Sequence, residues 1–294
     1  MRRRTNVRIV DDVTVDKPLV VGLLPAWNAE AFLQETLHSI SAQTYPNYKI
    51  LASIDKSTDR TAEILKEHAA NDDRYTIIEQ SERLGWVGNI NALLEAGEGD
   101  YFHFAFHDDI LLPAFVETCV SALKARPNAI LAYTDMTLTE QNGEVFDFVY
   151  PAQAPGVSAA ARASRLISMK NAWATPNRGV FSTEAARATG GMRKHRAGEF
   201  VADWTWLINL SLQGEFAYAP ETLVQKRIMK DSLSKTWDWS MWKFFSACED
   251  AAKIVNASDL SLVDKTQLHA AIAKRFAKTA LAKTARRFIP ALRR

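Results

Sequence analysis

The sequence predicts an α/β protein built on a Rossmann-like, mostly parallel sheet flanked by helices. Short apolar runs alternate with helical patterns through residues 19–135, and this alternation implies parallel strands joined by right-handed crossovers. An acidic pair, Asp108 and Asp109, directly follows one apolar run. Open α/β sheets bind ligands outside the carboxyl ends of their strands, so the pair is expected at a ligand-binding edge.

The first strand is predicted at Leu19–Leu24, a continuous apolar run that ends at Pro25. Asn28 is expected to cap the following helix, because apolar residues then recur at helical spacing. Further strands are predicted at Lys49–Ile54, Tyr75–Glu79, Tyr101–Phe106 and Ala129–Thr134, and helices at Arg60–Ala69, Val87–Ala96 and Pro113–Ala125.

Composition indicates an ordinary globular protein. Of the 294 residues, 47% are hydrophobic and 24% are charged, which excludes a disordered chain. Cys119 and Cys248 form neither a metal-type spacing nor a disulfide framework, so we expect a reducing, cytoplasmic location. No apolar run is long enough to cross a bilayer, and the chain starts with no signal-peptide core.

The last thirty residues are strongly basic. Residues 265–294 hold nine Lys and Arg and no Asp or Glu, so this segment could lie on an anionic membrane surface or dock a partner; no nucleic-acid partner is expected. A packed helix is the other interpretation, because Leu268, Ile272 and Phe276 recur at helical spacing. The aromatic cluster around Trp239 and Trp242 is open to the same alternatives, with packing as the default.

The acidic pair favours metal and phosphate chemistry. Asp108 and Asp109 can hold a divalent cation and, through it, a phosphate, although an isolated Asp-Asp turn is often only solvated. The turn after the first strand lacks the glycine pattern that binds a dinucleotide, and no P-loop is present. Trp27, in that turn, either stacks on a base or packs at the strand end.

Four segments resemble glycosyltransferase family 2, the inverting nucleotide-sugar enzymes with the GT-A fold. Val20–Asn28 stands where the family has a strand and turn of the type V-I-I-P-T-Y-N, and Leu37–Pro46 is similar to S-L-x-x-Q-T-Y-P. Ile50–Asp59 resembles a strand ending in V-D-D-G-S-T-D, and Glu98–Pro113 resembles G-E-Y-I-x-x-x-D-x-D-D-x-x-x-P. The resemblance implies a GT-A domain over residues 18–235, divided into a nucleotide-sugar half (18–112) and an acceptor and catalytic half (113–235), then an aromatic and basic helical region (236–294).

The resemblance also assigns roles to residues. Asp55 would accept a hydrogen bond from the base, Asp108 would lie at the ribose and the metal, and Asp109 would coordinate Mg²⁺ or Mn²⁺ on the diphosphate. The full set of implied donor-binding residues is Pro25, Trp27, Asn28, Asp55, Arg83, Asn91 and Asp108.

Several positions depart from the family pattern. Ile54 and Phe106 replace acids of the base-binding pair and of the D-x-D motif, and Arg83 stands where the family often has Asn. Met229 replaces a His that often contacts diphosphate or metal. A thioether binds Mg²⁺ poorly, so that contact is lost or taken by a neighbouring basic residue, Lys226, Arg227 or Lys230.

Asp203 is the predicted catalytic base. Its segment resembles the family's E-D-x-x-L pattern, with Ala202 in place of the usual Glu, and Glu199 is the fallback. An inverting transfer needs a base for the acceptor hydroxyl, whereas without the family pattern an acid that stabilises a helix N-terminus would be preferred. Possible acceptor or phosphate contacts are Asn177, Arg178, Glu199, Trp204, Arg227 and Lys230.

We therefore expect an inverting, metal-dependent glycosyltransferase that moves one sugar from a UDP-linked donor to a hydroxyl acceptor, as in bacterial surface glycan or polysaccharide synthesis. The processive-synthase pattern Q-x-x-R-W is absent, which favours single transfers. The expected partners are a nucleotide-sugar and a glycan or lipid-linked acceptor, with peripheral membrane contact through the basic end. The alternative is a catalytically silent GT-A domain that binds a nucleotide-sugar or glycan, or acts as a scaffold.

Overall fold

The computed structural model describes residues 17–169, 174–228 and 239–288 and confirms the α/β fold class. The strands are β1 (Val20–Ala26), β2 (Tyr48–Ile54), β3 (Tyr75–Glu79), β4 (Tyr101–Phe104), β5 (Asp109–Leu111), β6 (Ala129–Thr139), β7 (Val145–Phe148), β8 (Val180–Ser182) and β9 (Glu215–Arg227). The helices are α1 (Leu33–Ser41), α2 (Thr61–Ala69), α3 (Gly85–Ala96), α4 (Phe115–Ala125), α5 (Ala159–Ser168), η2 (Pro176–Arg178), α6 (Thr183–Ala188), α7 (Ala202–Gln213), α9 (Met241–Ala257) and α10 (Leu262–Phe288).

The predicted parallel half is present. Strands β3, β2, β1 and β4 are adjacent and parallel, and the β3 prediction matches residue for residue. Several boundaries were wrong: β1 continues through Pro25 to Ala26, and β6 continues to Thr139. β4 ends at Phe104 rather than Phe106, because the chain turns there and Asp109 N–H donates to the Phe106 carbonyl at 3.1 Å. Asn28 does not cap α1, which begins at Leu33.

In the second half of the sheet, a strand from later in the chain is inserted between two earlier strands. The short strand β8 lies between β4 and β6 and is antiparallel to both, so β4 and β6 run in the same direction without touching. The order is β3-β2-β1-β4-β8-β6-β9-β5, with β7 paired to β6. β9 is parallel to β6 and then pairs antiparallel with β5, so it reaches the acidic pair.

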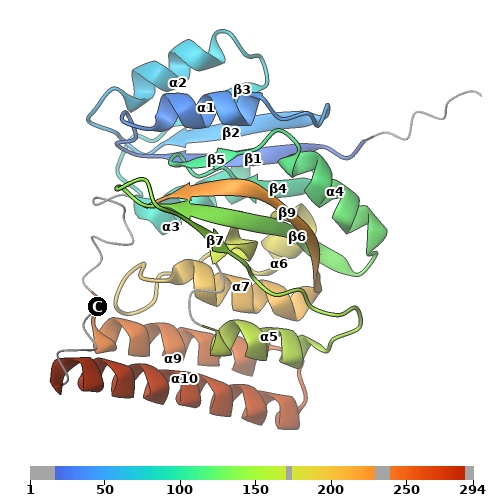
Figure 1. The fold of residues 1–294 in the computed structure, drawn as a ribbon, viewed down its shortest axis with the longest axis vertical. Helices are drawn as coiled ribbons and strands as arrows, with labels where there is room; N and C mark the ends of the chain where they lie inside the picture. Colours follow the sequence, from blue (N-terminus) through green and yellow to red (C-terminus); the bar gives the residue numbers. More distant parts are fainter. Residues whose placement is uncertain (1–16, 170–173, 229–238, 289–294) are drawn as a thin grey trace, which may run out of the picture.

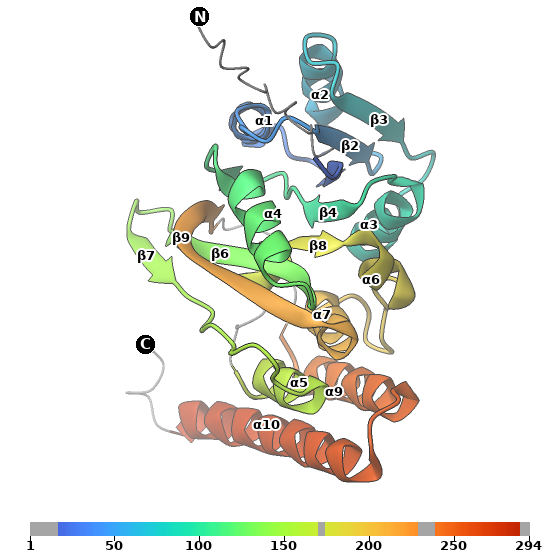
Figure 2. The ribbon, with the colours of Figure 1, turned by 90° about the vertical axis from the view of Figure 1, so that its right-hand side faces the viewer.

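Helices cover both faces of the sheet (Figures 1 and 2). One apolar cluster joins the sheet to α1, α2 and α4. The other joins it to α3, α5, α6, α7, α9 and α10. This layered arrangement buries the apolar side of each helix against the sheet or against another helix.

The C-terminal helices are part of the second cluster. Leu268 and Ile272 of α10 are 1% and 6% exposed, so the first half of this basic segment packs on the domain, as its helical spacing indicates. Phe276 lies in contact with Phe244 of α9, with ring centroids 6.2 Å apart. No described helix is both long and apolar enough to span a bilayer. The division at residue 235 stays a prediction.

Candidate functional site

The turn between β4 and β5 carries the acidic pair and is held from two sides. Thr36 Oγ1 of α1 lies 3.0 Å from the His107 carbonyl and 2.9 Å from the Asp109 carbonyl. Asp109 then starts β5, where it lies opposite Lys226 of β9. Directly opposed residues of an antiparallel pair project to the same face, so this register brings a carboxylate and an ammonium to one side of the sheet.

The Q-T-Y-P segment positions the same region. Gln43 is buried, its Nε2 donates to the Leu112 carbonyl at 2.9 Å, and its Oε1 accepts from Val116 N–H at 3.1 Å. Thr44 N–H donates to the Pro113 carbonyl at 2.9 Å. The segment therefore ties α1 to the chain that runs from β5 into α4.

Asp109 forms a buried ion pair with Arg178. Arg178 Nε lies 2.5 Å from Asp109 Oδ2, and the two side chains are 9% and 3% exposed. The guanidinium also donates to the Ala174 carbonyl at 2.9 Å and lies 4.8 Å from the Phe106 ring. The second carboxylate oxygen, Asp109 Oδ1, is buried and has no hydrogen-bond partner among the described residues.

The short helix η2 connects this pair to the predicted base. Asn177, next to Arg178, donates from Nδ2 to Asp203 Oδ2 at 3.3 Å. Asp203 lies in the first turn of α7, and its Oδ1 accepts from Trp204 N–H at 3.0 Å. Asn177 and Arg178 are 3% and 8% exposed, so both are buried connecting residues rather than open acceptor contacts.

Lys226 gives the site its second cation. Burial and the nearby Arg178 lower its pKa, and Asp109, Asp108 and Asp203 offset part of that effect. Within the described chain Lys226 forms no ion pair with any of these acids, unlike Arg178. A partly buried ammonium among three carboxylates is a strong candidate for binding an anionic ligand.

Asp108 has an ionised carboxylate. Burial alone would raise its pKa, but Lys226, His107 and Arg178 together outweigh burial, and the pKa lies below its ordinary value. Apart from its own backbone N–H, no residue of the described part of the chain forms a hydrogen bond or ion pair with its side-chain oxygens. Asp108 is thus the acid of the pair that remains available to a ligand.

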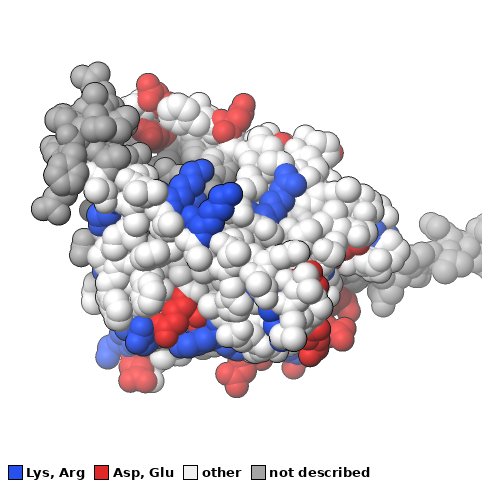
Figure 3. All heavy atoms as spheres, turned by 90° about the horizontal axis from the view of Figure 1, so that it is seen from below, with Lys and Arg blue, Asp and Glu red and all other residues white. Residues whose placement is uncertain are grey.

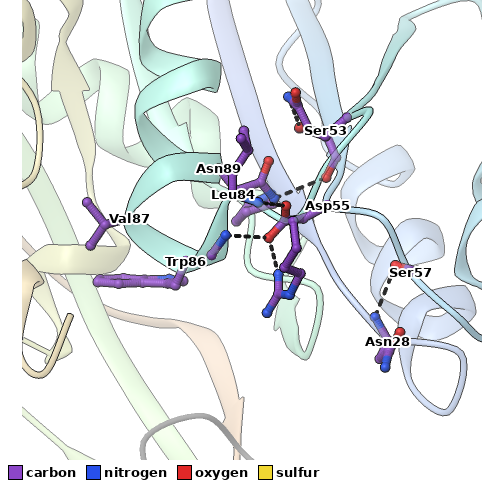
Figure 4. A network of polar contacts seen from close by, with 12 residues as sticks. Asn28, Ser53, Asp55, Ser57, Leu84, Trp86, Val87 and Asn89 are labelled. Atoms are coloured by element: carbon purple, nitrogen blue, oxygen red, sulfur yellow. Dashed lines mark hydrogen bonds and ion pairs between the residues drawn. The ribbon is translucent and has the colours of Figure 1, made fainter. Parts of the chain in front are cut away.

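The predicted base-binding acid, Asp55, lies at the N-terminus of α3 (Figure 4). It is 1% exposed. Its oxygens accept from the N–H groups of Leu84 at 2.6 Å and Gly85 at 3.1 Å, and it forms an ion pair with Arg83. Arg83 in turn stacks 3.7 Å above the Trp27 ring. Trp27 and Arg83 are thus the exposed members of this group.

Glu199 completes the same helix terminus. Its carboxylate accepts from the N–H groups of Trp86 at 3.1 Å and Val87 at 3.3 Å and pairs with Lys194 at 2.9 Å. A free helix N-terminus is an anion-binding site, but in α3 two carboxylates already occupy it. Glu199 is therefore placed to stabilise α3, and this contact does not fit the fallback role of base.

Two further predicted donor residues make internal contacts. Asn28 has φ of 44°, and its Oδ1 accepts from Thr58 N–H at 2.9 Å, which ties the β1 turn to the loop after β2. Asn91 exchanges two hydrogen bonds with the backbone of Met192, at 2.8 and 2.9 Å. A Cβ on Gly191 would lie 2.7 Å from Asn91 Oδ1, which explains a glycine there. The carbonyl of Pro25 lies 2.9 Å from His107 Nδ1, next to the acidic turn.

The remaining predicted contacts have different surroundings. Arg227 Nε donates to the Asp108 carbonyl at 2.7 Å, and its other nitrogens bind Glu35 and Thr36. Trp204 is 1% exposed and its indole N–H donates to the Leu166 carbonyl at 3.0 Å, so an acceptor contact does not fit this burial. Lys230 lies outside the described residues.

A divalent cation fits the site through one acid. Among the described residues no three His, Cys, Asp or Glu side chains gather as a metal centre. Mg²⁺ is commonly held by one or two carboxylates plus substrate phosphates. Asp108 is ionised and available, whereas Asp109 is buried against Arg178, so the donor set matches a cation that is shared with a bound diphosphate.

Comparison with known proteins accounts for this arrangement. Residues 23–143 match the family described as Glycosyl transferase family 2. That stretch is 121 of the 294 residues, so the chain is similar to this family over about two fifths of its length. An uncharacterized glycosyltransferase of Haemophilus influenzae is 34% identical over 43% of this chain and 40% of its own length. The putative teichuronic acid biosynthesis glycosyltransferase TuaG of Bacillus subtilis is 30% identical over 45% of this chain and 52% of its own.

Solved structures show that the fold is that of GT-A glycosyltransferases. The structure of S. aureus TarS 1–349 in complex with UDP-GlcNAc matches with a TM-score of 0.71 at 16% identity, over 87% of this chain and 72% of that one. The mannosyltransferase PcManGT from Pyrobaculum calidifontis, in complex with GDP-Man and Mn²⁺, matches with a TM-score of 0.59 at 18% identity, over 92% of this chain and 76% of that one.

The departures from the family 2 pattern have structural counterparts. Phe106, in place of an acid, packs on the Arg178 guanidinium. Ile54 is a core residue at 3% exposure. The sequence indicated Lys226 only as one of three basic residues near Met229, which stands where the family often has a His that contacts diphosphate or metal. The position of Lys226 opposite Asp109 depends on the pairing of β5 with β9, which no local pattern reveals.

Proposed function

We propose that this protein is an inverting glycosyltransferase that moves one sugar from a nucleotide-diphosphate donor, UDP-linked, to a hydroxyl acceptor. The observation that carries the proposal is the arrangement of Asp108, Lys226 and Asp203 at the sheet edge, with η2 joining Asp203 to the Asp109 ion pair. Binding of UDP-GlcNAc by TarS and of GDP-Man by PcManGT supports a nucleotide-sugar donor. The choice of UDP stays a prediction.

Asp203 is the proposed base. Its carboxylate takes the proton of the acceptor hydroxyl as that oxygen attacks the anomeric carbon, and the bond from that carbon to the diphosphate oxygen breaks. Attack on the face opposite the leaving group inverts the configuration. Asn177 orients Asp203 through the 3.3 Å hydrogen bond.

Asp108 and Lys226 are the proposed leaving-group site. Asp108 would hold Mg²⁺ or Mn²⁺, which would supply positive charge to the diphosphate leaving group. Lys226 adds a point charge on the same side, where an ammonium forms charge-assisted hydrogen bonds to phosphate oxygens. Of the three basic residues that could replace the family's His, Lys226 is favoured, since Arg227 is engaged by Asp108 O, Glu35 and Thr36.

On the base side we propose that Trp27 and Arg83 contact the nucleotide. Both oxygens of Asp55 already accept hydrogen bonds from α3, so Asp55 acts by holding Arg83. The Arg83–Trp27 stack is then the surface that a base meets, with Trp27 37% exposed.

Surface glycan or polysaccharide synthesis is the proposed context. It rests on the names of relatives such as TuaG and the putative glycosyltransferase EpsE of Bacillus subtilis. The cytoplasmic location and peripheral membrane contact belong to the same proposal. The chain covers only 40% and 52% of the first two relatives, so their activities are not transferred to it.

The test is donor binding and turnover across UDP-, GDP- and dTDP-sugars, with Mn²⁺ or with EDTA. We expect Asp108→Asn to remove the metal dependence of binding, and Asp203→Asn to keep binding while lowering turnover by about 10²- to 10⁴-fold. Asp73→Asn, at an exposed acid of the α2–β3 loop, is the matched control and should change neither. Turnover by Asp203→Asn at the wild-type rate would exclude Asp203 as the base.

A catalytically silent domain is the second candidate. Two observations favour a silent domain. Asp55 and Glu199 already occupy the N-terminus of α3, and Arg178 neutralises Asp109. Nucleotide-sugar binding with neither hydrolysis nor transfer, in every metal tested, would support this function instead.

A further inference from the structure

Three aromatic side chains at the start of α9 are exposed. Trp239, Trp242 and Phe245 are 40%, 54% and 43% exposed. They are not scattered: the Trp242 and Phe245 rings lie 6.1 Å apart, and Phe245 lies 5.7 Å from Phe276 of α10. A contiguous exposed apolar group of this kind marks an interaction surface.

Two cations lie on these rings. Lys283 Nζ is 4.7 Å from the centre of the Trp239 ring, and Arg196 is 5.0 Å from that of Trp242. The nearby acid, Glu249, is itself paired with Arg196 at 2.7 Å. We refer to one set of residues as the aromatic patch: Arg196, Trp239, Trp242, Phe245, Phe276 and Lys283.

The basic character continues along α10. Lys274 and Lys278 are exposed on this helix, and the view from below shows a mostly uncharged face carrying Lys and Arg groups, with most acidic groups toward its edges (Figure 3). The surroundings of the patch therefore favour an anionic partner.

The patch is connected to the helix that carries Asp203. Trp239 lies 6.3 Å from Phe200, and Trp204, the neighbour of Asp203, stacks on Phe244 of α9 at 6.1 Å. The N-terminal ends of α7 and α9 and the C-terminal end of α10 lie on one side of the molecule (Figure 1). A ligand of the patch is thus held on the side of the proposed base.

We propose that the aromatic patch binds the headgroup region of an anionic lipid bilayer. Trp and Phe rings beside Lys and Arg match that region, where rings enter the boundary with the acyl chains and cations meet phosphates. A second copy of the chain fits less well, because a two-fold contact through the patch would bring the positively charged Arg196 and Lys283 of both copies into one interface. This inference deepens the peripheral membrane contact of the proposed function by naming its residues and its lipid, and that the acceptor is presented at this bilayer rests on that function; lipid binding can be measured without a donor or an acceptor.

Deleting the C-terminus is a poor test, because Leu268 and Ile272 are buried and their loss would open the core. Surface substitutions in the full chain avoid this problem. The patch variant is Trp242→Ser with Phe245→Ser, and the charge variant is Lys283→Gln. The control is Leu262→Ser with Val263→Ser, which are 83% and 66% exposed and lie about 30 Å from Lys283 along α10.

Co-sedimentation with phosphatidylcholine vesicles, with and without phosphatidylglycerol, gives the readout. We expect binding only with phosphatidylglycerol, weaker at high salt. The patch variant should bind about tenfold more weakly, the charge variant about fivefold, and the control like wild type.

Wild-type binding that does not depend on phosphatidylglycerol, or a patch variant that binds like the control, would overturn the proposal, and a second copy or an acidic protein would then become the favoured partner. UDP binding measured without vesicles reports separately on the proposed function, so the two failures are distinguishable.

Discussion

The ion pair between Asp109 and Arg178 gives a sharp test of how the site is held together. Both side chains are almost fully buried, so neither can be resolvated when its partner is lost. Arg178→Met leaves Asp109 with an uncompensated charge, and Oδ1 already lacks a partner among the described residues. Removing one member of a buried pair typically costs about 3–5 kcal/mol, and we expect a loss of that size in the free energy of unfolding.

The assay is urea unfolding at pH 7, followed by tryptophan fluorescence. Asp109→Asn in the Arg178→Met background removes the stranded charge, so the double variant should recover much of the lost stability. Arg60→Gln, which breaks the solvent-exposed pair with Glu63, is the control and should have no measurable effect. A loss below about 1 kcal/mol for Arg178→Met, or no recovery in the double variant, would refute the reasoning.

Three further predictions concern the buried His103, the proposed diphosphate site and the N-terminus of α3. Burial lowers the pKa of His103 from 6.5 to about 4, so between these pH values only the unfolded chain binds a proton at this residue. The free energy of unfolding should therefore fall by up to about 3 kcal/mol as the pH drops through that window. In urea titrations, His103→Gln should remove this pH-dependent loss of stability. In calorimetry with EDTA present, Lys226→Met should weaken UDP binding about tenfold without changing uridine binding, and Lys226→Arg should retain most of the UDP affinity. An equal loss of uridine binding would contradict the placement of Lys226 at the diphosphate. Glu199→Gln should cost about 1 kcal/mol in urea unfolding, because it weakens the carboxylate contacts at the start of α3.

Much of the nucleotide-binding half could be predicted because its signals are local. β3 is a short apolar run bounded by turn residues, and the prediction of Tyr75–Glu79 needed nothing more. The Asn28 cap failed because its side chain binds Thr58, 30 residues away, instead of the helix that follows it. Local propensity cannot reveal which of two partners a polar side chain takes.

The site itself was predicted only in part. Asp108 and Asp203 follow from motif positions, but the contacts around them span the chain. Glu199 binds the N–H of Trp86 across 113 residues of sequence, and Arg178 reaches Asp109 across 69. Neither Glu199 nor Arg178 carries a pattern of its own. Their partners depend on the insertion of β8 between β4 and β6, which no local sequence signal predicts.

Phe106 and Arg178 are best understood together. The Arg178 guanidinium lies 4.8 Å from the centre of the Phe106 ring, so an acid at position 106, as in the family pattern, would lie beside it and compete with Asp109 for it. With Phe106 there, the ring covers the guanidinium and Asp109 takes the charge alone, since an arginine stacks on an aromatic face while keeping its planar donors for a carboxylate. The loss of one acid is then matched by the use of a second acid for structure, so in the proposed function Asp108 is the acid that faces a ligand. The proposal gives Lys226 a matching role, because a single carboxylate with a divalent cation and one ammonium would supply the positive charge that a diphosphate requires.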